Sequence, residues 1–265
     1  TMTQTVSVAL CTYNGEAYLA EQLDSILAQT LLPNEIVVSD NGSDDKTMDI
    51  LERYKVTSAV PIVIYRNPNR QGITKNFEYC LSRCSGDWIF LCDQDDIWLP
   101  DKLECFMQII RAIDSQNLPT LIYSDAVIVD KKLNRVRHTL NKKLPRKKSL
   151  FLHLLLGNPI TGCVVVVNRD LVNLALPIPD DFTIHDWWLA LWAAAAGQII
   201  YLDKVTTLYR QHENNAIGAS LVPRKPSDFI AKLQKNYTPG NYRHAKNAEI
   251  FKERYISSQE MPNAT

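Results

Sequence analysis

Three carboxylates follow directly on an apolar run in the stretch 90–100, which reads FLCDQDDIWLP. Asp93, Asp95 and Asp96 repel one another at this spacing, so a hard divalent cation such as Mg²⁺ or Mn²⁺ among them would explain their proximity. Such a cation recruits phosphate oxygens as further ligands, and the first hypothesis is therefore a phosphate-handling enzyme. The alternative is a turn in which Asp96 caps a helix that begins at Ile97.

The elements that must position these carboxylates are visible as four short β-rich segments that alternate with helical patterns. Apolar residues on one face of 18–27, for example, recur with the period of an amphipathic helix. The alternation predicts an α/β fold with a mostly parallel sheet and right-handed crossovers. The expected strands are 6–12, 35–40, 61–65 and 88–92, and the expected helices are about 18–27, 45–54 and 73–83.

Polar residues stand at the carboxyl end of each of these four strands. Ligands of open α/β sheets bind at this edge, so the polar groups of four separate segments should converge on one site. The residues concerned are Thr12, Tyr13 and Asn14, then Asp40, then 67–70, and finally 93–96. This convergence favours the cation hypothesis over the capping alternative.

Two common phosphate-binding motifs are missing from the sequence. The turn after the first strand reads TYNGE instead of GxGxxG, and no GxxxxGK[ST] segment occurs anywhere. Phosphates would therefore have to be bound mainly by a cation and by side chains.

Composition sets further limits on the protein. At 265 residues with 46% hydrophobic residues, the chain can bury the core of one large domain, with or without an appendage. The formal net charge is zero, which gives no reason to expect nucleic acid as a partner. Six cysteines without zinc spacing indicate reduced core residues in a cytoplasmic protein. We expect neither a signal peptide nor a run of roughly 20 apolar residues that could span a bilayer.

The second half of the chain contains further strands and a basic segment. Strands are expected over 121–129, 163–168, 199–202 and 205–209. Lys142, Lys143, Arg146, Lys147 and Lys148 precede the apolar run SLFLHLLL. A solvated loop followed by a buried helix is the favoured interpretation. The alternative is that the segment 142–156 rests on an anionic membrane.

The last part of the chain, from 221 to 265, carries many Lys and Arg residues among scattered aromatic residues. Its pattern predicts two short helices that are interrupted at Pro239-Gly240. Such an extension could pack on the core, join subunits or touch a membrane, and the sequence does not distinguish these.

Four segments, in this order and spacing, carry a resemblance to a known family: VSVALCTYNGEAYLAEQLDSILAQT, EIVVSDNGSDDKT, NPNRQGITKNFE and FLCDQDDIWLPDKL. They resemble the GT-A nucleotide-diphospho-sugar glycosyltransferases of the large inverting family 2. Within it, they are similar to bacterial rhamnosyltransferase-like enzymes that build O-antigen and cell-wall polysaccharides. The resemblance covers about residues 5–218. It implies a Rossmann-like GT-A domain over 1–220, with a mixed, mostly parallel sheet flanked by helices, and a helical extension over 221–265.

The resemblance also implies an activity. A family member would move a hexose or deoxyhexose from a nucleotide-diphospho-sugar to a hydroxyl group of a lipid-linked or polysaccharide acceptor, with inversion and with Mn²⁺ or Mg²⁺. The favoured donor is dTDP-rhamnose. The alternatives are a UDP-galactosyl- or UDP-glucosyltransferase of the same fold and, from a different class, an inactive nucleotide-sugar-binding module.

The catalytic and metal-binding roles that follow are expectations from the resemblance. Asp186, in the helix start HDWW, matches the family's catalytic base, and Asp95 matches the metal ligand, with Asp93 beside it. His212, in YRQHENN, matches a loop histidine that joins the cation or the diphosphate. The structural alternatives are a plain N-terminal helix charge for Asp186 and an ordinary structural histidine for His212.

The substrate contacts are expectations of the same kind. Asp40 would accept the N3–H of uracil or thymine, and the Tyr13 ring would stack on that base. The remaining donor contacts are expected from Thr12, Asn14, Glu16, Asn69, Arg70, Gly72, Lys75, Asp93 and Arg210. The acceptor contacts are expected from Gly162, Trp187 and Trp188, although Gly162 could serve close packing and one of the two indoles should belong to the core.

Overall fold

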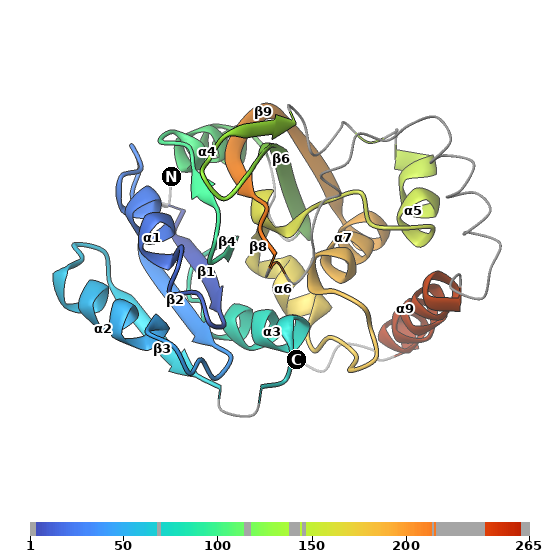
Figure 1. Ribbon diagram of the computed structural model, residues 1–265. Helices are drawn as coiled ribbons and strands as arrows, with labels where there is room; N and C mark the ends of the chain where they lie inside the picture. Colours follow the sequence, from blue (N-terminus) through green and yellow to red (C-terminus); the bar gives the residue numbers. More distant parts are fainter. Residues whose placement is uncertain are drawn as a thin grey trace.

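The computed structural model describes residues 4–67, 70–113, 118–137, 144, 147–213, 215 and 242–260. Its strands form one sheet in the order β3-β2-β1-β4-β8-β6-β9-β5, with β7 paired to β6 (Figure 1). The strands are β1 Val6–Thr12, β2 Glu35–Asp40, β3 Ile62–Arg66, β4 Trp88–Asp93, β5 Ile97–Trp98, β6 Thr120–Val129, β7 Arg135–Arg137, β8 Val165–Asn168 and β9 Gln198–Arg210. The helices are α1 Leu19–Leu27, α2 Thr47–Thr57, α3 Ile73–Arg83, α4 Lys102–Ala112, α5 Lys147–Leu155, α6 Arg169–Ala175, α7 His185–Ala196 and α9 Tyr242–Glu260, with a 3₁₀ turn η1 at Gly162–Val164.

The predicted parallel half of the sheet is confirmed. Strands β1 to β4 pair in parallel, and β8 joins β4 in the antiparallel direction, so the sheet is mixed. In this register Thr12 lies beside Asp40, and Cys11 lies beside Asp93. The carboxyl ends of β1, β2 and β4 therefore meet at one edge, which is the requirement for a shared site there.

Both faces of the sheet are covered, which explains why its strands are apolar at nearly every position. Along β1, Val8 and Leu10 belong to a cluster with α1, α2 and α4, whereas Ala9 and Cys11 belong to a cluster with α3, α6 and α7. Successive side chains of a strand point to opposite faces, so a fully buried strand shows no polar alternation. No helix among the described residues is long and apolar enough to cross a membrane.

Two details of the predicted elements are wrong. Asp96 does not cap a helix, because β5 follows it and α4 begins only at Lys102, after its N-cap residue Asp101. The two segments expected over 199–202 and 205–209 are one long strand, β9, whose exposed Asp203 and Lys204 suggested an interruption. Of the two predicted C-terminal helices, the described residues contain α9, and 216–241 lie outside them.

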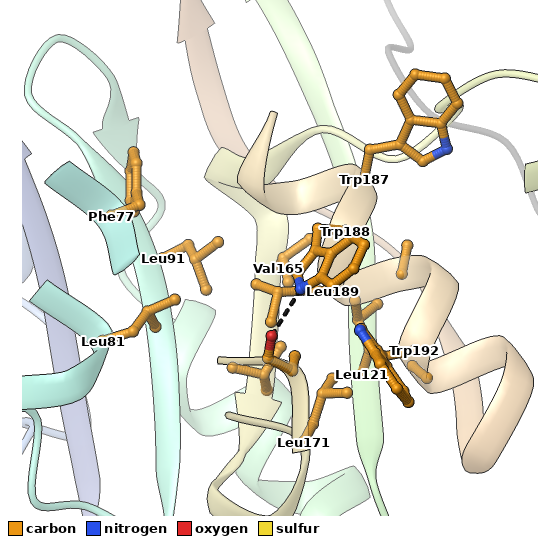
Figure 2. Close-up of a cluster of buried hydrophobic side chains, with 14 of the residues drawn as sticks. Phe77, Leu81, Leu91, Leu121, Val165, Leu171, Trp187, Trp188, Leu189 and Trp192 are labelled. Atoms are coloured by element: carbon orange, nitrogen blue, oxygen red, sulfur yellow. Dashed lines mark hydrogen bonds between the residues drawn. The ribbon is translucent and has the colours of Figure 1, made fainter. Parts of the chain in front are cut away.

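The second cluster centres on tryptophans of α7 (Figure 2). The indole N–H of Trp187 donates to the Leu154 carbonyl at 2.6 Å, and that of Trp188 donates to the Ala175 carbonyl at 2.7 Å. Trp187 is 3% exposed and Trp188 is fully buried. In this structure neither indole is available to an acceptor sugar, because packing encloses both rings and protein carbonyls bind both N–H groups.

Helix α9 completes this cluster. Its Phe251 packs edge-on against Trp188 and Trp192, with ring centroids 5.6 and 5.2 Å apart. Figure 1 shows α9 next to α5 and α7, on the opposite side of the molecule from α2. Part of the predicted C-terminal extension thus contributes to the same hydrophobic core as the sheet.

Truncation of Trp188 should show how much this cluster stabilises the fold. We expect Trp188→Ala to lower the free energy of unfolding by about 3–5 kcal/mol, because a buried aromatic side chain is replaced by a cavity. Urea unfolding followed by circular dichroism measures the change. Val56→Ala is the control, since Val56 is 84% exposed and should leave the midpoint unchanged. Equal midpoints for the two variants would contradict the packing described here.

Candidate active site

A cavity of about 390 Å³ opens at the carboxyl ends of β1, β2 and β4. Its walls come from the loops after these strands, from the start of α3, from η1 and from the first residues of α7. The sheet register brings the strand ends together, and η1 and α7 close the cavity from the second half of the chain. Its polar or charged lining residues are Thr12, Tyr13, Asn41, Asn76, Asp93, Gln94, Asp95, Thr161, His185, Asp186, Tyr209 and Asn215.

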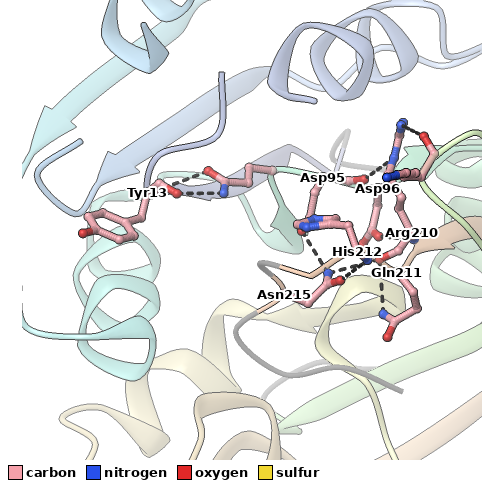
Figure 3. A network of polar contacts seen from close by, with 9 residues as sticks. Tyr13, Asp95, Asp96, Arg210, Gln211, His212 and Asn215 are labelled. Carbon is pink, nitrogen blue, oxygen red and sulfur yellow. Dashed lines mark hydrogen bonds and ion pairs between the residues drawn. The ribbon is translucent and has the colours of Figure 1, made fainter. Parts of the chain in front are cut away.

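The acidic cluster forms one wall of this cavity. Asp93 ends β4, Asp95 follows two residues later, and both line the cavity. Asp95 Oδ2 lies 2.8 Å from His212 Nε2 and accepts a hydrogen bond from Asn215 Nδ2 at 3.1 Å (Figure 3). The His212 ring also packs against Tyr18, with centroids 4.6 Å apart. The loop that carries His212 and Asn215 is thereby joined to Asp95, which lies 117 and 120 positions earlier in the chain.

The charge of this wall suits a divalent cation. Burial, and to a smaller extent the nearby carboxylates Asp95 and Asp186, raise the pKa of Asp93 to about 7, and a cation would favour its charged form. No group of three or more His, Cys, Asp or Glu side chains with metal-binding geometry occurs among the described residues. A cation that takes its remaining ligands from substrate phosphates and water needs only one or two carboxylates, however, and the chemistry of Asp93, Asp95 and His212 fits such a cation.

Behind this wall, Asp96 and Arg210 hold the loop in place. Asp96 is fully buried and accepts the backbone N–H of Arg210 at 3.0 Å. The Arg210 guanidinium donates to the Asp95 carbonyl at 2.9 Å and to Glu21 Oε2 at 2.6 Å, and it lies over the Tyr18 ring. Its side chain is only 2% exposed. Arg210 therefore fixes the backbone of the acidic loop, and the structure does not bring it to the cavity as a phosphate ligand.

A buried lysine lies near the same cluster. Lys102 donates from Nζ to the Cys163 carbonyl at 2.7 Å and to Thr207 Oγ1 at 2.8 Å. It is fully buried, which lowers its pKa to about 8. Burial raises the pKa values of Asp93 and Asp96, and the Lys102 charge opposes this rise only in part. Lys102 could not be identified from the sequence, since a lysine is rarely fully buried and its partners Cys163 and Thr207 are distant in the chain.

Asp186 lines the same cavity from the start of α7. Its Oδ2 accepts the Gly162 N–H at 2.9 Å, and its Oδ1 accepts Asn158 Nδ2 at 2.9 Å and the Trp187 N–H at 2.7 Å. Burial raises its pKa to about 7, although the backbone donors act in the other direction. The carboxylate is thus held in one orientation and can accept a proton near neutral pH.

Gly162 permits this arrangement. A Cβ at this position would lie 3.4 Å from Asp186 Oδ2 and 3.3 Å from His185 Nε2. A larger residue would push either the carboxylate or the imidazole away from η1. Gly162 therefore lies where the resemblance expected it, but its described contacts are with the protein's own side chains.

Asp40, which was expected to bind the base of the donor, does not reach the cavity. This carboxylate is fully buried and accepts hydrogen bonds from the Thr12 and Ser43 hydroxyls and from the Gly42 and Ser43 N–H groups. It does not line the cavity. The next residue, Asn41, does line it, and its buried Oδ1 has no hydrogen-bond partner among the described residues. Asn41 follows the end of β2 directly, so the convergence of strand ends was the signal that could have identified it.

Tyr13 lies at the rim of the cavity. It is 43% exposed, and its backbone exchanges two hydrogen bonds with the Gln94 side chain, at 2.8 and 2.9 Å (Figure 3). The Arg70 guanidinium lies 5.5 Å from the centre of its ring and pairs with Asp44 at 3.0 Å. Gly72, with a φ of +85°, lines the cavity just before α3.

The remaining expected donor contacts lie elsewhere or are not described. Asn14 Oδ1 accepts the Asp44 N–H and Glu16 Oε2 accepts the Lys46 N–H, so both tie the loop after β1 to the loop after β2. Lys75 pairs with Glu78 and Asp180 and does not line the cavity. Asn69 lies outside the described residues.

Comparison with known proteins identifies a family that matches this chain. The profile described as Glycosyl transferase family 2 matches residues 7–171. The dTDP-rhamnosyl transferase RfbG of Shigella flexneri is 32% identical over 225 residues, which cover 80% of this chain and 74% of RfbG. The uncharacterized protein Rv1520 of Mycobacterium tuberculosis is 26% identical, and the match covers 83% of this chain and 62% of Rv1520.

Solved structures support the same fold. The crystal structure of S. aureus TarS 1–349 superposes with a TM-score of 0.58 at 20% identity and covers 78% of this chain. The same protein in complex with UDP-GlcNAc gives a TM-score of 0.56 at 18% identity and covers 96% of this chain. These alignments span 60% and 73% of the TarS chains, and at such identity they show the fold alone.

Proposed function

The chain belongs to glycosyl transferase family 2, and from this premise we propose that its cavity binds a nucleotide-diphospho-sugar and transfers the sugar to a hydroxyl group. The predicted family, the GT-A fold and the glycosyltransferase class are confirmed by the comparisons. The observation that carries the proposal is one cavity that is lined both by a buried carboxylate at the start of α7, Asp186, and by the acidic pair Asp93 and Asp95. A base and an anchor for a diphosphate would thus face the same substrate.

The diphosphate would lie at the acidic wall. Asp95, Asp93 and His212 are the residues proposed to hold a Mn²⁺ or Mg²⁺ ion. When bound, such an ion neutralises the charge that develops on the leaving diphosphate. Arg210 and Asp96 keep the Asp95 backbone in position, as their buried hydrogen bonds to this loop and to each other indicate.

Asp186 is the proposed catalytic base. An acceptor hydroxyl is a poor nucleophile, so a carboxylate within hydrogen-bonding reach must take its proton as the new bond forms to the anomeric carbon. The bond from that carbon to the diphosphate oxygen breaks with its electron pair, and the product has the inverted configuration. Gly162 and Asn158 hold the Asp186 carboxylate ready, so no reorientation is needed before proton transfer.

The base of the donor is proposed to be a pyrimidine, with dTDP-rhamnose as the favoured donor because of the similarity to RfbG. Asn41 supports this choice, since its amide can accept from a ring N3–H and donate to a neighbouring carbonyl. A UDP-sugar is the alternative donor, because the structurally similar TarS has been crystallised with UDP-GlcNAc. A bacterial surface glycan, polymeric or lipid-linked, is the proposed acceptor.

A donor panel tests the proposal directly. The protein with Mn²⁺ is incubated with dTDP-rhamnose, UDP-glucose, UDP-galactose, UDP-N-acetylglucosamine and GDP-mannose, and both thermal shift and donor hydrolysis are recorded. We expect dTDP-rhamnose to give the largest response, and proton NMR of the transfer product to show the inverted configuration. Failure of every nucleotide-sugar to bind would exclude the proposed function.

The pH dependence of transfer should follow Asp186. Its raised pKa of about 7 leaves the carboxylate protonated at lower pH, where it cannot accept the proton of the acceptor hydroxyl. We expect kcat, at saturating donor and cation, to rise about tenfold per pH unit below 7 and to level off near pH 8. A profile that is flat between pH 5.5 and 8 would contradict the assignment.

Membrane contact is proposed for the surface of α5. Leu152 of α5 and Leu156 directly after it are 62% and 78% exposed, and the side chains of the five basic residues over 142–148 lie outside the described ones. We expect the double variant Leu152→Ser, Leu156→Ser to lose at least half of its binding to phosphatidylglycerol vesicles in a flotation assay. Val56→Ser, an equally exposed change on α2, is the control. Equal flotation of both variants and the wild type would exclude this surface.

A further inference from the structure

His185, next to the proposed base, is the most unusual polar side chain of the cavity. It lines the cavity but is only 3% exposed, and neither ring nitrogen has a hydrogen-bond partner among the described residues. Burial removes both ring nitrogens from water without giving them a described partner, which is unfavourable for folding. Buried polar groups of native proteins are nearly always hydrogen-bonded, so a ligand bound in the cavity is expected to supply the missing partners.

The surroundings of the ring fix its position and its charge. It stacks on Phe77, with centroids 3.8 Å apart and an angle of 15° between the planes. Burial lowers its pKa to about 3, so the imidazole is neutral at physiological pH. A neutral imidazole offers one N–H donor and one acceptor nitrogen, whereas it offers no positive charge to a phosphate.

The position of the ring identifies the part of the substrate that it can reach. An added Cβ at Gly162 would lie 3.3 Å from His185 Nε2 and 3.4 Å from Asp186 Oδ2, so Gly162, the imidazole and the Asp186 carboxylate border one spot of the cavity lining. If Asp186 accepts the proton of the acceptor hydroxyl, the two sugars meet next to this pair. A sugar hydroxyl, which can both donate and accept a hydrogen bond, matches the neutral imidazole.

We propose that His185 is a specificity-determining residue, which binds a hydroxyl group of one of the two sugars beside Asp186. The inference rests on the proposed function and deepens it. Stacking on Phe77 fixes the plane of the ring, and the lack of a side chain at Gly162 avoids a close contact with Nε2. The hydroxyl belongs either to the donor sugar or to the acceptor sugar, and the kinetics of one variant distinguish them.

The informative variant is His185→Phe. A phenyl ring keeps the shape and the stacking on Phe77 but removes both polar atoms, so the unfolding midpoint should stay the same or rise. We expect kcat/KM for transfer from dTDP-rhamnose to an octyl glycoside to fall about tenfold. His185→Asn restores a donor and an acceptor and should recover part of the lost kcat/KM. If His185 served packing alone, the smaller asparagine would give no such recovery.

The readouts separate the two sources of the hydroxyl. If the donor sugar supplies it, the affinity for dTDP-rhamnose and its hydrolysis without acceptor both fall, whereas the affinity for dTDP is unchanged. If the acceptor supplies it, donor affinity and hydrolysis stay the same, and the KM for the octyl glycoside rises.

Unchanged kinetics of His185→Phe, or an equal loss of affinity for dTDP itself, would overturn the inference while the proposed function stands. A wild-type protein that binds neither dTDP nor UDP in the presence of Mn²⁺ would overturn both.

Discussion

Asp186→Asn should lower kcat for sugar transfer by about 10²–10⁴-fold while leaving donor binding nearly intact. The amide is close in shape to the carboxylate and can still accept the Gly162 N–H, but it cannot take a proton from the acceptor hydroxyl. Transfer is measured with dTDP-rhamnose and an octyl glycoside, and donor binding is measured by calorimetry. Wild-type turnover in this variant would exclude Asp186 as the base.

Asp49→Asn is the matched control for this variant. Asp49 lies in the first turn of α2 and is exposed, so the same chemical change occurs at a helix start outside the cavity. We expect normal transfer in the control and unfolding midpoints within a few degrees of the wild type for both variants. A common loss of activity in the two proteins would show that the charge change acts on folding rather than on proton transfer.

Asp95→Ala should abolish the cation dependence of donor binding and lower transfer about 100-fold or more at any fixed Mn²⁺ concentration. The change removes the carboxylate that lies 2.8 Å from His212 Nε2. Calorimetric titration of dTDP with and without Mn²⁺ measures the effect. The wild type should bind dTDP more tightly with the ion, whereas the variant should bind it equally weakly in both conditions.

His212→Ala and Asp44→Ala complete this comparison. His212→Ala removes another proposed ligand of the cation and should reduce the Mn²⁺ dependence of dTDP binding less strongly than Asp95→Ala does. Asp44→Ala removes an exposed carboxylate that pairs with Arg70 at the other side of the cavity rim and should keep the Mn²⁺ effect. Cation-dependent binding in Asp95→Ala at the wild-type level would show that the ion is held elsewhere.

The sequence predicted the parallel half of the sheet because its signals are local. Each strand is an apolar run that ends in a polar turn, and strand ends of a parallel sheet must meet at one edge. Asp93, Asp95 and Asp186 could be proposed on this basis and on the family resemblance, and the structure brings all three to one cavity.

The predictions that differed depend on partners far away in the chain. Asp96 was expected to be a helix cap, but it binds the backbone of Arg210, 114 residues later. One of the two indoles of Trp187 and Trp188 was expected in the core and the other near a sugar, but both are buried, and carbonyls of α5 and α6 accept their N–H groups. Asp40 was expected to bind the base, but its own loop surrounds it, and only the three-dimensional arrangement distinguishes it from Asn41.

The packing of Phe251 on Trp188 and Trp192 limits which segments of the chain can be exchanged between relatives. The family profile ends at 171, yet the proposed base, the proposed ligand His212 and the helix that covers the base's own helix all lie beyond it. The segment that matches the family profile, 7–171, is therefore shorter than the part of the chain that forms the hydrophobic core and the proposed site. Exchange of the region after 171 between relatives would replace the base, one metal ligand and half of a hydrophobic core in one step, so these parts should be inherited as a block.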